Sequence, residues 1–329
     1  MKSRTTLKKI STNLNLSIAT VSRALKNHPD ISDETKQKVK ALASLLEYEP
    51  NTYAINLRTN SSKIFGLIVP KISNTFYDSF IEAAEQKARE FGFSLMILQS
   101  GDDPLMEAEN LRLCKANRVA GIIISIVPGS LPEPFKKIED AGIPFIFFDK
   151  VPDTDAYNKV CLADKEAAIL AANSIISHHK KSVLALFGNS HLSITQKRWK
   201  AFMDTFEQAS PQTKVSTRHC DNSNEAMQIM LEFGSPKSID HVFAMSDEIL
   251  VGVMKALYQL KIRIPDEVSV SAISNGFLPT IFNPAITHVE TSGYELGKLA
   301  IQRMIDYLGG QTFTRSIILP SRLVEGKSM

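Results

Sequence analysis

The sequence predicts an α/β protein: an N-terminal unit of three helices in a helix-turn-helix arrangement, followed by two lobes built on parallel sheets. Three observations support this fold class. The 329 residues are enough for two or three units with buried cores. Apolar residues recur at helical spacing near the N-terminus. After residue 63, apolar runs of strand length alternate with amphipathic helices, as they do in βαβ units.

The first 48 residues contain the three helical patterns. Asn15, Leu16 and Ser17 form a tight polar turn between the first two patterns, and Ser17 is a natural N-cap for the second helix. Ser32 is expected to cap the third helix, because acidic residues follow it in the first turn. The apolar residues that recur three and four positions apart are Leu7, Ile10 and Leu14, then Ile18, Val21 and Leu25, then Val39, Leu42 and Leu46.

Residues 50–62 are expected to form a linker. Pro50 ends the preceding helix, and residues 59–62 are polar and flexible in character. Between them, residues 51–58 are long enough for a helix of about two turns, which is marginal alone in water.

The remainder of the chain alternates between strands and helices, and its apolar runs are those of strands buried on both faces of parallel sheets. Strands are expected at 64–70, 93–100, 121–127, 144–150, 182–188, 214–220, 241–246 and 268–274. Helices are expected at 76–91, 105–117, 132–141, 164–178, 195–209, 223–233 and 247–260. About ten such units exceed one comfortable domain, so two α/β lobes are predicted, with ligands bound beyond the carboxyl ends of their strands.

Positive charge is concentrated at the N-terminal end. Residues 1–60 contain ten lysines and arginines against five acidic residues, a net charge of +5, whereas residues 61–329 contain 28 against 30, a net charge of −2. A basic unit on a near-neutral body favours binding to a polyanion such as nucleic acid. A solvated basic arm without a partner is the alternative.

The cellular compartment is expected to be the cytoplasm. Cys114, Cys161 and Cys220 are far apart and show no CxxC spacing, which suits free thiols in a reducing environment. The N-terminal residues contain no apolar run of the secretory type, and no window approaches the roughly 18 apolar residues of a membrane span.

The second helical pattern, LSIATVSRAL, has the composition of a helix that reads DNA in the major groove. Ile18 and Ala19 can approach base edges and thymine methyl groups, and Arg23 can make a bidentate contact to guanine. Ser17, Thr20 and Ser22 can hydrogen-bond phosphate oxygens. The alternative is an N-terminal helical cap on the α/β body, in which these hydroxyls make only local bonds.

The chain as a whole resembles the lac-repressor family of bacterial transcription regulators. The run LKKISTNLNLSIATVSRALKNHPDISDETKQKV is similar to the DNA-reading headpiece of that family. PNTYAINLRTNSSKIFGLIVPKISNTFY is similar to its hinge, first strand and ligand loop, and FAMSDEILVGVMKALYQLKIRIPDEVSV to a stretch of its second lobe. The resemblance implies a periplasmic-binding-protein-like core and covers residues 5–325.

The domain boundaries follow from this resemblance. A headpiece is expected at 1–49, a hinge helix and linker at 50–62, and an effector-binding and dimerisation core at 63–329. Within the core, lobe one is expected at about 63–162 and 291–317, and lobe two at about 163–290 and 318–329.

The resemblance also gives the hinge a role and shows two departures. It places Leu57 at the leucine that family dimers wedge into the minor groove at the operator centre. Asn15 stands where the family often has glycine, but asparagine also adopts left-handed turns, so the turn is expected to survive. Ile55 stands where some members have an arginine, so that contact is not expected.

The effector site is expected in the cleft between the lobes. The loop after the first strand contributes Asn74 and Phe76, an amide and an aromatic face of the kind that holds sugars and other flat polar ligands. Ser125 ends the third strand and is expected to face the same cleft. By resemblance, Arg198 clamps the effector, and Asp247 and Asn275 lie at polar positions of the site. A capping or surface role is the alternative for each of them.

The pair Ser274–Asn275 stands where many members carry two aspartates. Serine and asparagine keep hydrogen-bonding capacity without the negative charge. An effector that is a phosphorylated or acidic sugar derivative, rather than a plain neutral sugar, is therefore one hypothesis.

These observations predict a ligand-controlled transcriptional regulator, either a repressor or an activator with repression expected, that binds a palindromic double-stranded DNA operator. A homodimer is expected in preference to a tetramer. A solute-binding module without a DNA role is the alternative of another class. An enzyme is not expected, since no nucleophile–base pair, GxGxxG or P-loop signature is present. No cofactor and no membrane partner is expected. A metal site is not expected either, because His178 and His179 have no second pair of ligands.

Overall fold

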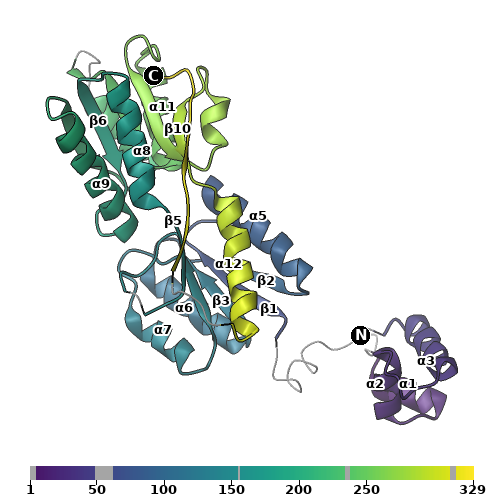
Figure 1. Cartoon of the computed structure of the whole chain (residues 1–329). Helices are drawn as coiled ribbons and strands as arrows, with labels where there is room; N and C mark the ends of the chain where they lie inside the picture. The colour runs from purple at the N-terminus through teal and green to yellow at the C-terminus, as the bar shows by residue number, and fades with distance from the viewer. Residues whose placement is uncertain (1–4, 49–61, 155, 234–237, 312–315) are drawn as a thin grey trace. The chain divides into compact units, whose positions relative to one another are not determined.

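The computed structural model describes residues 5–48, 62–154, 156–233, 238–311 and 316–329. The chain divides into two compact units, residues 1–61 and residues 62–329, which are described separately below (Figure 1). No helix among the described residues is long and apolar enough to cross a membrane.

Residues 5–48 form three helices: α1 (Leu7–Leu14), α2 (Ile18–Leu25) and α3 (Asp33–Leu45). Both predicted N-caps are confirmed. The Thr20 backbone N–H donates to Ser17 Oγ at 3.0 Å, and the Thr35 N–H donates to Ser32 Oγ at 3.3 Å. Each cap satisfies a backbone donor that has no partner within its helix, which explains where α2 and α3 begin.

The turn between α1 and α2 depends on Asn15. This residue has a φ of 53°, in the left-handed region, and the following Leu16 N–H donates to the Ser11 carbonyl at 3.0 Å. The expectation that asparagine would preserve the turn is confirmed. The three helices then bury one small core, made of Ile10, Val21, Ala24, Val39 and Ala43.

The first lobe of the 62–329 unit is built on a sheet in the order β11-β5-β4-β3-β1-β2. All the pairings described in this sheet are parallel. Its strands are β1 (Ile64–Val69), β2 (Ser94–Gln99), β3 (Gly121–Ile124), β4 (Phe145–Phe148), β5 (Lys159–Leu162) and β11 (Ser316–Leu319). Its helices are α5 (Thr75–Glu90), α6 (Pro104–Ala116), α7 (Pro132–Glu139) and α12 (Gly293–Leu308).

Helices cover both faces of this sheet. Phe65, Leu67 and Val69 of β1 pack with α5 and α12, whereas Ile68 of the same strand packs with α6 and α7. Alternate side chains of a strand point to opposite faces, so a strand buried on both faces needs an unbroken apolar run.

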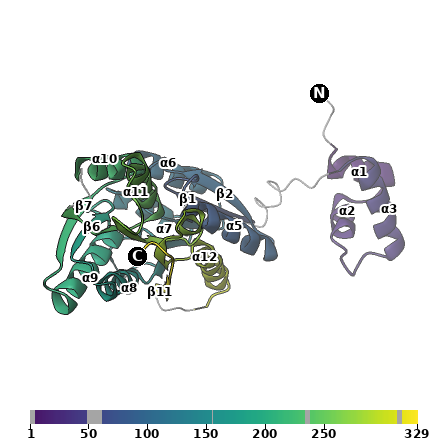
Figure 2. The ribbon, with the colours of Figure 1, turned by 90° about the horizontal axis from the view of Figure 1, so that it is seen from above.

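The second lobe repeats this strand order as β12-β10-β9-β8-β6-β7. Its strands are β6 (Ser182–Phe187), β7 (Lys214–His219), β8 (His241–Ala244), β9 (Ser269–Ser274), β10 (Thr287–Glu290) and β12 (Arg322–Val324), of which β12 alone pairs antiparallel. Its helices are α8 (Asp164–Ser177), α9 (Ser193–Ala209), α10 (Ser223–Phe233) and α11 (Asp247–Gln259), with a 3₁₀ turn, η2 (Leu278–Ile281). Figure 2 shows α8 and α9 on one side of β6 and β7, and α10 and α11 on the other.

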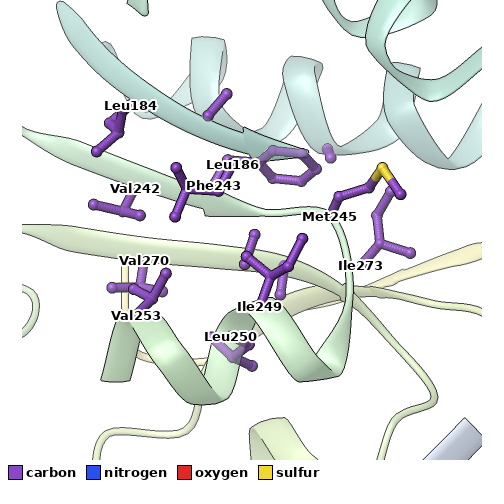
Figure 3. Packing of buried hydrophobic residues seen from close by; sticks show 14 of the residues in the cluster. Leu184, Leu186, Val242, Phe243, Met245, Ile249, Leu250, Val253, Val270 and Ile273 are labelled. Atoms are coloured by element: carbon purple, nitrogen blue, oxygen red, sulfur yellow. The ribbon is translucent and has the colours of Figure 1, made fainter. Parts of the chain in front are cut away.

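The core of the second lobe is formed mainly by aliphatic side chains. Figure 3 shows Ile249, Leu250 and Val253 of α11 beneath Val242 and Val270 of the sheet. All five are at least nine-tenths buried. This packed core sets the position of the loops at the carboxyl ends of its strands.

The described chain passes between the lobes after β5, after β10 and between β11 and β12 (Figure 1). Because β11 pairs with β5 as far as Leu319, the first lobe extends two residues beyond the boundary expected at 317. Only after Leu319 does the chain return to the second sheet, at Arg322.

The strands and helices predicted between residues 64 and 274 are confirmed, with ends displaced by at most three residues. Two of the strands differ in burial: β2 and β7 are edge strands and are half-exposed rather than buried on both faces. The elements that were not predicted are β5, β10, β11, β12, α12 and η2.

The unpredicted elements have weak local signals. The strands are three or four residues long and include polar residues. Helix α12 contains Gly293 and Gly297, which lower helix propensity. A Cβ at either glycine would lie 2.5 Å from a carbonyl oxygen of α5, so close packing between the helices requires these residues.

Candidate functional site

The first candidate site is the exposed surface of α2. Val21 and Ala24 are buried in the small core, whereas Ala19 and Arg23 are exposed and Ile18 keeps 48% of its surface accessible. About half of the Ile18 surface is in contact with water rather than with its own unit. The side chains predicted to read bases therefore share the solvent side of α2.

The three hydroxyl residues of α2 lie beside this surface. Ser17 is exposed, and Thr20 and Ser22 are half-buried. Ser17 Oγ and Thr20 Oγ1 share a hydrogen bond of 2.8 Å, in addition to the cap. A hydroxyl group has one donor and two acceptor sites, so both groups retain capacity for a phosphate oxygen. The predicted hinge leucine, Leu57, and Ile55 lie outside the described residues.

The second candidate site is a cavity of about 230 Å³ between the two lobes. Its walls come from loops at the carboxyl ends of strands in both sheets, where open parallel sheets bind ligands. Of the predicted residues, Asn74, Phe76, Arg198, Asp247 and Asn275 line it.

Asn74 begins the wall on the first lobe. Its Oδ1 accepts the Phe76 backbone N–H at 2.9 Å, which makes it the N-cap of α5. The capping role and the cavity position coexist, because the side chain caps the helix at the end that faces the cleft. The Phe76 ring lies beside it, edge to face with Tyr77 at 5.5 Å between centroids.

Arg198 of α9 is only 4% exposed and is already partnered. Its Nε–H donates to Asp164 Oδ1 at 2.9 Å, and its Nη1–H donates to the Met245 carbonyl at 3.1 Å. Burial raises the pKa of Asp164, and the Arg198 charge opposes that rise. Asp164 was not predicted; it positions the guanidinium at the edge of the cavity.

Asp247, at the start of α11, joins the two lobes. Ser274 Oγ donates to its Oδ1, while Thr75 Oγ1 donates to Oδ2 at 3.2 Å and the Asn275 backbone N–H donates to Oδ2 at 3.1 Å. Thr75 belongs to the first lobe, and the other donors belong to the second. Burial raises the pKa of Asp247, and these three hydrogen bonds oppose the rise.

Asn275 continues this connection with its side-chain amide. Its Nδ2 donates to the Thr75 carbonyl at 3.2 Å and to Ser79 Oγ at 2.9 Å, and its Oδ1 accepts the Gly293 N–H at 2.8 Å. Both amide donors are therefore used within the protein. Asn275 lines the cavity, but the structure uses it mainly to hold the lobes together.

Ser125 does not face the cleft, contrary to expectation. It is fully buried, is absent from the cavity wall, and shares a hydrogen bond of 3.1 Å with Tyr77 Oη. Tyr77 Oη in turn donates to Asp149 Oδ2 at 2.7 Å. Ser125 thus lies behind Tyr77 and supports it, because a strand end faces the cleft only where no neighbouring side chain covers it.

The charged groups of the cavity leave an acidic excess. Each lysine or arginine in its wall has an acidic partner: Lys71 with Glu248 at 3.6 Å, Lys150 with Asp102 at 3.1 Å, and Arg198 with Asp164. Three carboxylates of the wall have no ion-pair partner among the described residues: Asp149, Asp221 and Asp247.

Thr195 was also missed. It lines the cavity, it is 1% exposed, and its Oγ1 has no hydrogen-bond partner among the described residues. Buried hydroxyls almost always have a partner, so this one is available to a ligand. Its position three residues before Arg198 places it on the first turn of α9 and could have drawn attention to it.

Comparisons with known proteins cover both units. Residues 6–51 match the model of the bacterial regulatory proteins of the lacI family. Residues 62–327 match the model of periplasmic binding proteins and the sugar binding domain of that family.

The relatives are similar over more than nine-tenths of their length. The chain is 25% identical to the ribose operon repressor of Halalkalibacterium halodurans, over 97% of this chain and 96% of that protein. It is 27% identical to the transcriptional regulator RegA of Clostridium acetobutylicum, over 91% of each. A crystal structure of the lac repressor dimer, bound to operator and an anti-inducer, matches its fold with a TM-score of 0.88, at 20% identity and 99% coverage of both chains.

Proposed function

Because this chain belongs to the lacI family of bacterial regulatory proteins, we propose that it represses transcription as a homodimer on a palindromic DNA operator, under the control of a small effector in the cleft. The exposed face of α2 is the observation that carries the DNA role. Ile18, Ala19 and Arg23 face solvent there with no partner of their own among the described residues.

In this proposal α2 enters the major groove. Arg23 reads a guanine, Ile18 and Ala19 contact base edges or thymine methyl groups, and the hydroxyls of Ser17, Thr20 and Ser22 contact phosphates. Leu57 wedges into the minor groove at the operator centre. A site on DNA requires the protein to act in the cytoplasm.

Selection from a random DNA pool tests this role. The wild type is expected to enrich a palindrome, Arg23→Ala to relax one position in each half-site, and Leu57→Ala to weaken binding to the whole site. Lys200→Ala, an exposed change on α9, is the matched control and should enrich the wild-type sequence. If the folded protein enriches no sequence at low salt, the DNA role is wrong and a solute-binding module becomes the better description.

The cleft supports a neutral, hydroxyl-rich effector such as a sugar. Asn74, Thr195 and the carboxylate of Asp149 offer hydrogen bonds to hydroxyl groups, and Phe76 offers an aromatic face. The acidic excess and the pairing of Arg198 with Asp164 oppose a phosphate group. The structure therefore favours a neutral sugar over the phosphorylated or acidic derivative suggested by Ser274 and Asn275.

Calorimetry with matched pairs of sugars and sugar phosphates tests this choice. The neutral member of a pair should bind more tightly. Tighter binding of the phosphate would contradict the proposal and restore the acidic effector.

Exposed apolar side chains on both lobes support the homodimer. Ile97 on the edge strand β2 and Leu105 and Met106 on α6 are exposed in lobe one, and so are Tyr258 and Phe277 in lobe two. Burying such patches against a second copy removes apolar surface from water. Sedimentation should give twice the mass of one chain, and Phe277→Glu should shift the equilibrium toward the monomer.

The coupling between the two sites goes through the lobes. An effector that contacts both lobes changes their angle, which alters the hinge segments that precede residue 62 and so changes DNA affinity. This coupling is typically worth about 1–3 kcal/mol and is reciprocal, so operator DNA must change effector affinity by the same factor.

A further inference from the structure

The side chain of Asn275 in lobe two makes three hydrogen bonds to lobe one. Its Nδ2 donates to the Thr75 carbonyl at 3.2 Å and to Ser79 Oγ at 2.9 Å, and its Oδ1 accepts the Gly293 N–H at 2.8 Å. These partners lie at the N-terminal ends of α5 and α12. One amide therefore holds two helices of lobe one at once.

This set of bonds requires a side chain that both donates and accepts. The Thr75 carbonyl is an acceptor, whereas the N–H of Gly293, the first residue of α12, is a donor without an acceptor inside its own helix. An amide supplies two N–H donors and an oxygen acceptor, but a carboxylate only accepts. The connection thus depends on the amide of Asn275.

Asp247 adds a second connection beside the first. Its Oδ2 accepts Thr75 Oγ1 at 3.2 Å and the Asn275 backbone N–H at 3.1 Å. Asp247 is buried, so these bonds lie in a medium of low polarity, which strengthens them. Thr75 is consequently bound to lobe two through both its side chain and its carbonyl group.

Two further polar contacts join the lobes within the described residues, and each is a single interaction. Ser193 Oγ donates to the Val151 carbonyl at 3.1 Å, and Lys71 Nζ lies 3.6 Å from Glu248 Oε1. Lys71 is exposed, and exposed ion pairs contribute little to stability. Most of the described hydrogen bonds between the lobes therefore belong to the network around Asn275.

The helices α5 and α12 connect this network to the start of lobe one. They lie side by side in direct backbone contact, since a Cβ at Gly293 would be 2.5 Å from the Phe76 carbonyl oxygen (Figure 1). Both pack on the sheet face that includes Phe65 of β1, the first strand after the linker. The bonds of Asn275 thus fix, relative to lobe two, the part of lobe one that follows the linker.

We propose that Asn275 is a latch, which holds the lobes together through protein groups alone, and that the effector controls the protein by releasing this latch. The inference rests on the proposed function, since it assigns a mode of regulation to the same cleft. Asn275 and Asp247 line the first cavity, so a ligand hydroxyl there competes with Thr75 and Ser79 for their hydrogen bonds.

The direction of the effect follows from the energetics of linked equilibria. A ligand shifts an equilibrium only by the difference between its affinities for the two arrangements. Protein groups already stabilise the latched arrangement of the lobes. An effector that changes the lobe angle therefore binds more tightly to the released arrangement.

Hydrogen exchange of the Gly293 amide in the full-length protein, without added ligand, tests the latch. Ser79→Ala removes one bond of the Asn275 amide and leaves the acceptor of the Gly293 N–H in place. Because the bonds of a latch open together, Gly293 should exchange about fivefold faster, the factor expected for one lost hydrogen bond. Ser79 is outside the cavity wall, so this substitution leaves the ligand contacts intact.

Ser177→Ala on α8 is the matched control. Ser177 Oγ donates to the Ser174 carbonyl at 2.8 Å, as Ser79 Oγ donates to the Phe76 carbonyl at 2.9 Å, but the partners of Ser177 belong to lobe two. Gly293 should exchange in this variant as in the wild type. Unchanged exchange in Ser79→Ala would overturn the latch.

Affinity for the selected operator, measured without effector, tests the regulation. Asn275→Asp removes both donors and places a carboxylate against the Thr75 carbonyl, so it should release the lobes more than Ser79→Ala does. Both variants should change operator affinity in the same direction, about threefold for Ser79→Ala and at least about tenfold for Asn275→Asp, while Ser177→Ala matches the wild type.

The contrary outcomes identify which part is wrong. Faster Gly293 exchange with the operator affinity of the wild type would show that the latch does not control DNA binding. If the wild type binds no operator, the proposed DNA role fails and the regulation fails with it. Gly293 exchange still decides the latch in that case, because the measurement uses neither DNA nor effector.

Discussion

The two candidate sites use arginine in opposite ways. Arg23 on α2 is exposed and makes no ion pair among the described residues, whereas Arg198 in the cleft is 4% exposed and bound to Asp164 and the Met245 carbonyl. The first arginine is available for a partner and contributes little to its own fold. Arg198 stabilises the fold through these bonds, and a ligand can use only the N–H groups of its guanidinium that remain free of them. Substitutions should therefore separate recognition from stability in the headpiece but not in the cleft.

The largest effect is expected from Asp164→Ala. It leaves the buried Arg198 guanidinium without its counter-charge, and breaking a buried pair from one side costs about 3–5 kcal/mol. Urea unfolding followed by the fluorescence of Trp199, the single tryptophan, measures this loss in the second lobe.

The control for this change is Lys200→Ala on the same helix, which removes an exposed ion pair with Asp204. Exposed pairs contribute only about 0–1 kcal/mol. Equal losses in the two variants would show that burial does not distinguish the cleft from the surface.

Arg23→Ala should have the second-largest effect. It should lower the affinity for DNA and leave the free energy of unfolding nearly unchanged. Loss of a bidentate contact to guanine costs about 1–3 kcal/mol of discrimination, and an exposed change alters stability by less than about 0.5 kcal/mol. Fluorescence anisotropy with the selected operator and with a version changed at the guanine measures both affinities at one salt concentration. A uniform loss on both sequences would make Arg23 a phosphate contact.

His241, buried in the second lobe, should make the stability of the protein depend on pH. Its ring lies between Ser269 Oγ and Ser271 Oγ, at 2.8 Å from each, and burial lowers its pKa from 6.5 to about 3, with smaller effects from Lys180 and His178. Between pH 6.5 and 3 the unfolded chain binds a proton that the folded chain does not, so stability falls as the pH is lowered through this window.

Lowering the pH from 7.5 to 5.5 should thus cost about 1.4 kcal/mol through His241 alone. Urea unfolding at the two pH values measures the difference, and His241→Gln should remove this part of it. An unchanged difference in the variant would show that His241 is not the group responsible.

Ser17→Ala should have the smallest effect. In contrast to Arg23, Ser17 is expected to contribute to both stability and DNA binding, because it is an N-cap and a proposed phosphate contact. Loss of the cap costs about 1 kcal/mol of helix stability. Hydrogen exchange of the α2 amides measures this loss. Ser17→Asp keeps a cap and adds a charge that repels DNA, so it should restore protection without restoring operator binding.

Local sequence patterns predicted an element correctly wherever the interactions that form it lie within a few residues of one another. The caps at Ser17 and Ser32, the turn at Asn15 and the alternation of strands and helices from 64 to 274 all depend on neighbours in sequence. Prediction failed for α12, whose glycines are explained by their contact with α5 more than 200 residues earlier.

The same distinction applies to the cleft. The sequence by itself determined that α2 has an apolar face, which its spacing placed at Ile18, Val21 and Leu25. The structure buries Val21 and Ala24 instead and leaves Ile18 48% exposed. The sequence also determined that polar residues would gather at the carboxyl ends of the strands. Only the tertiary structure decided which of them remain available. Within the described part of the chain, the Thr195 hydroxyl has no hydrogen-bond partner, whereas Ser125, Arg198 and Asn275 are partnered. Arg198 and Asp164 are 34 positions apart and Asn275 and Ser79 are 196 apart, so their pairing follows from packing rather than from any local pattern.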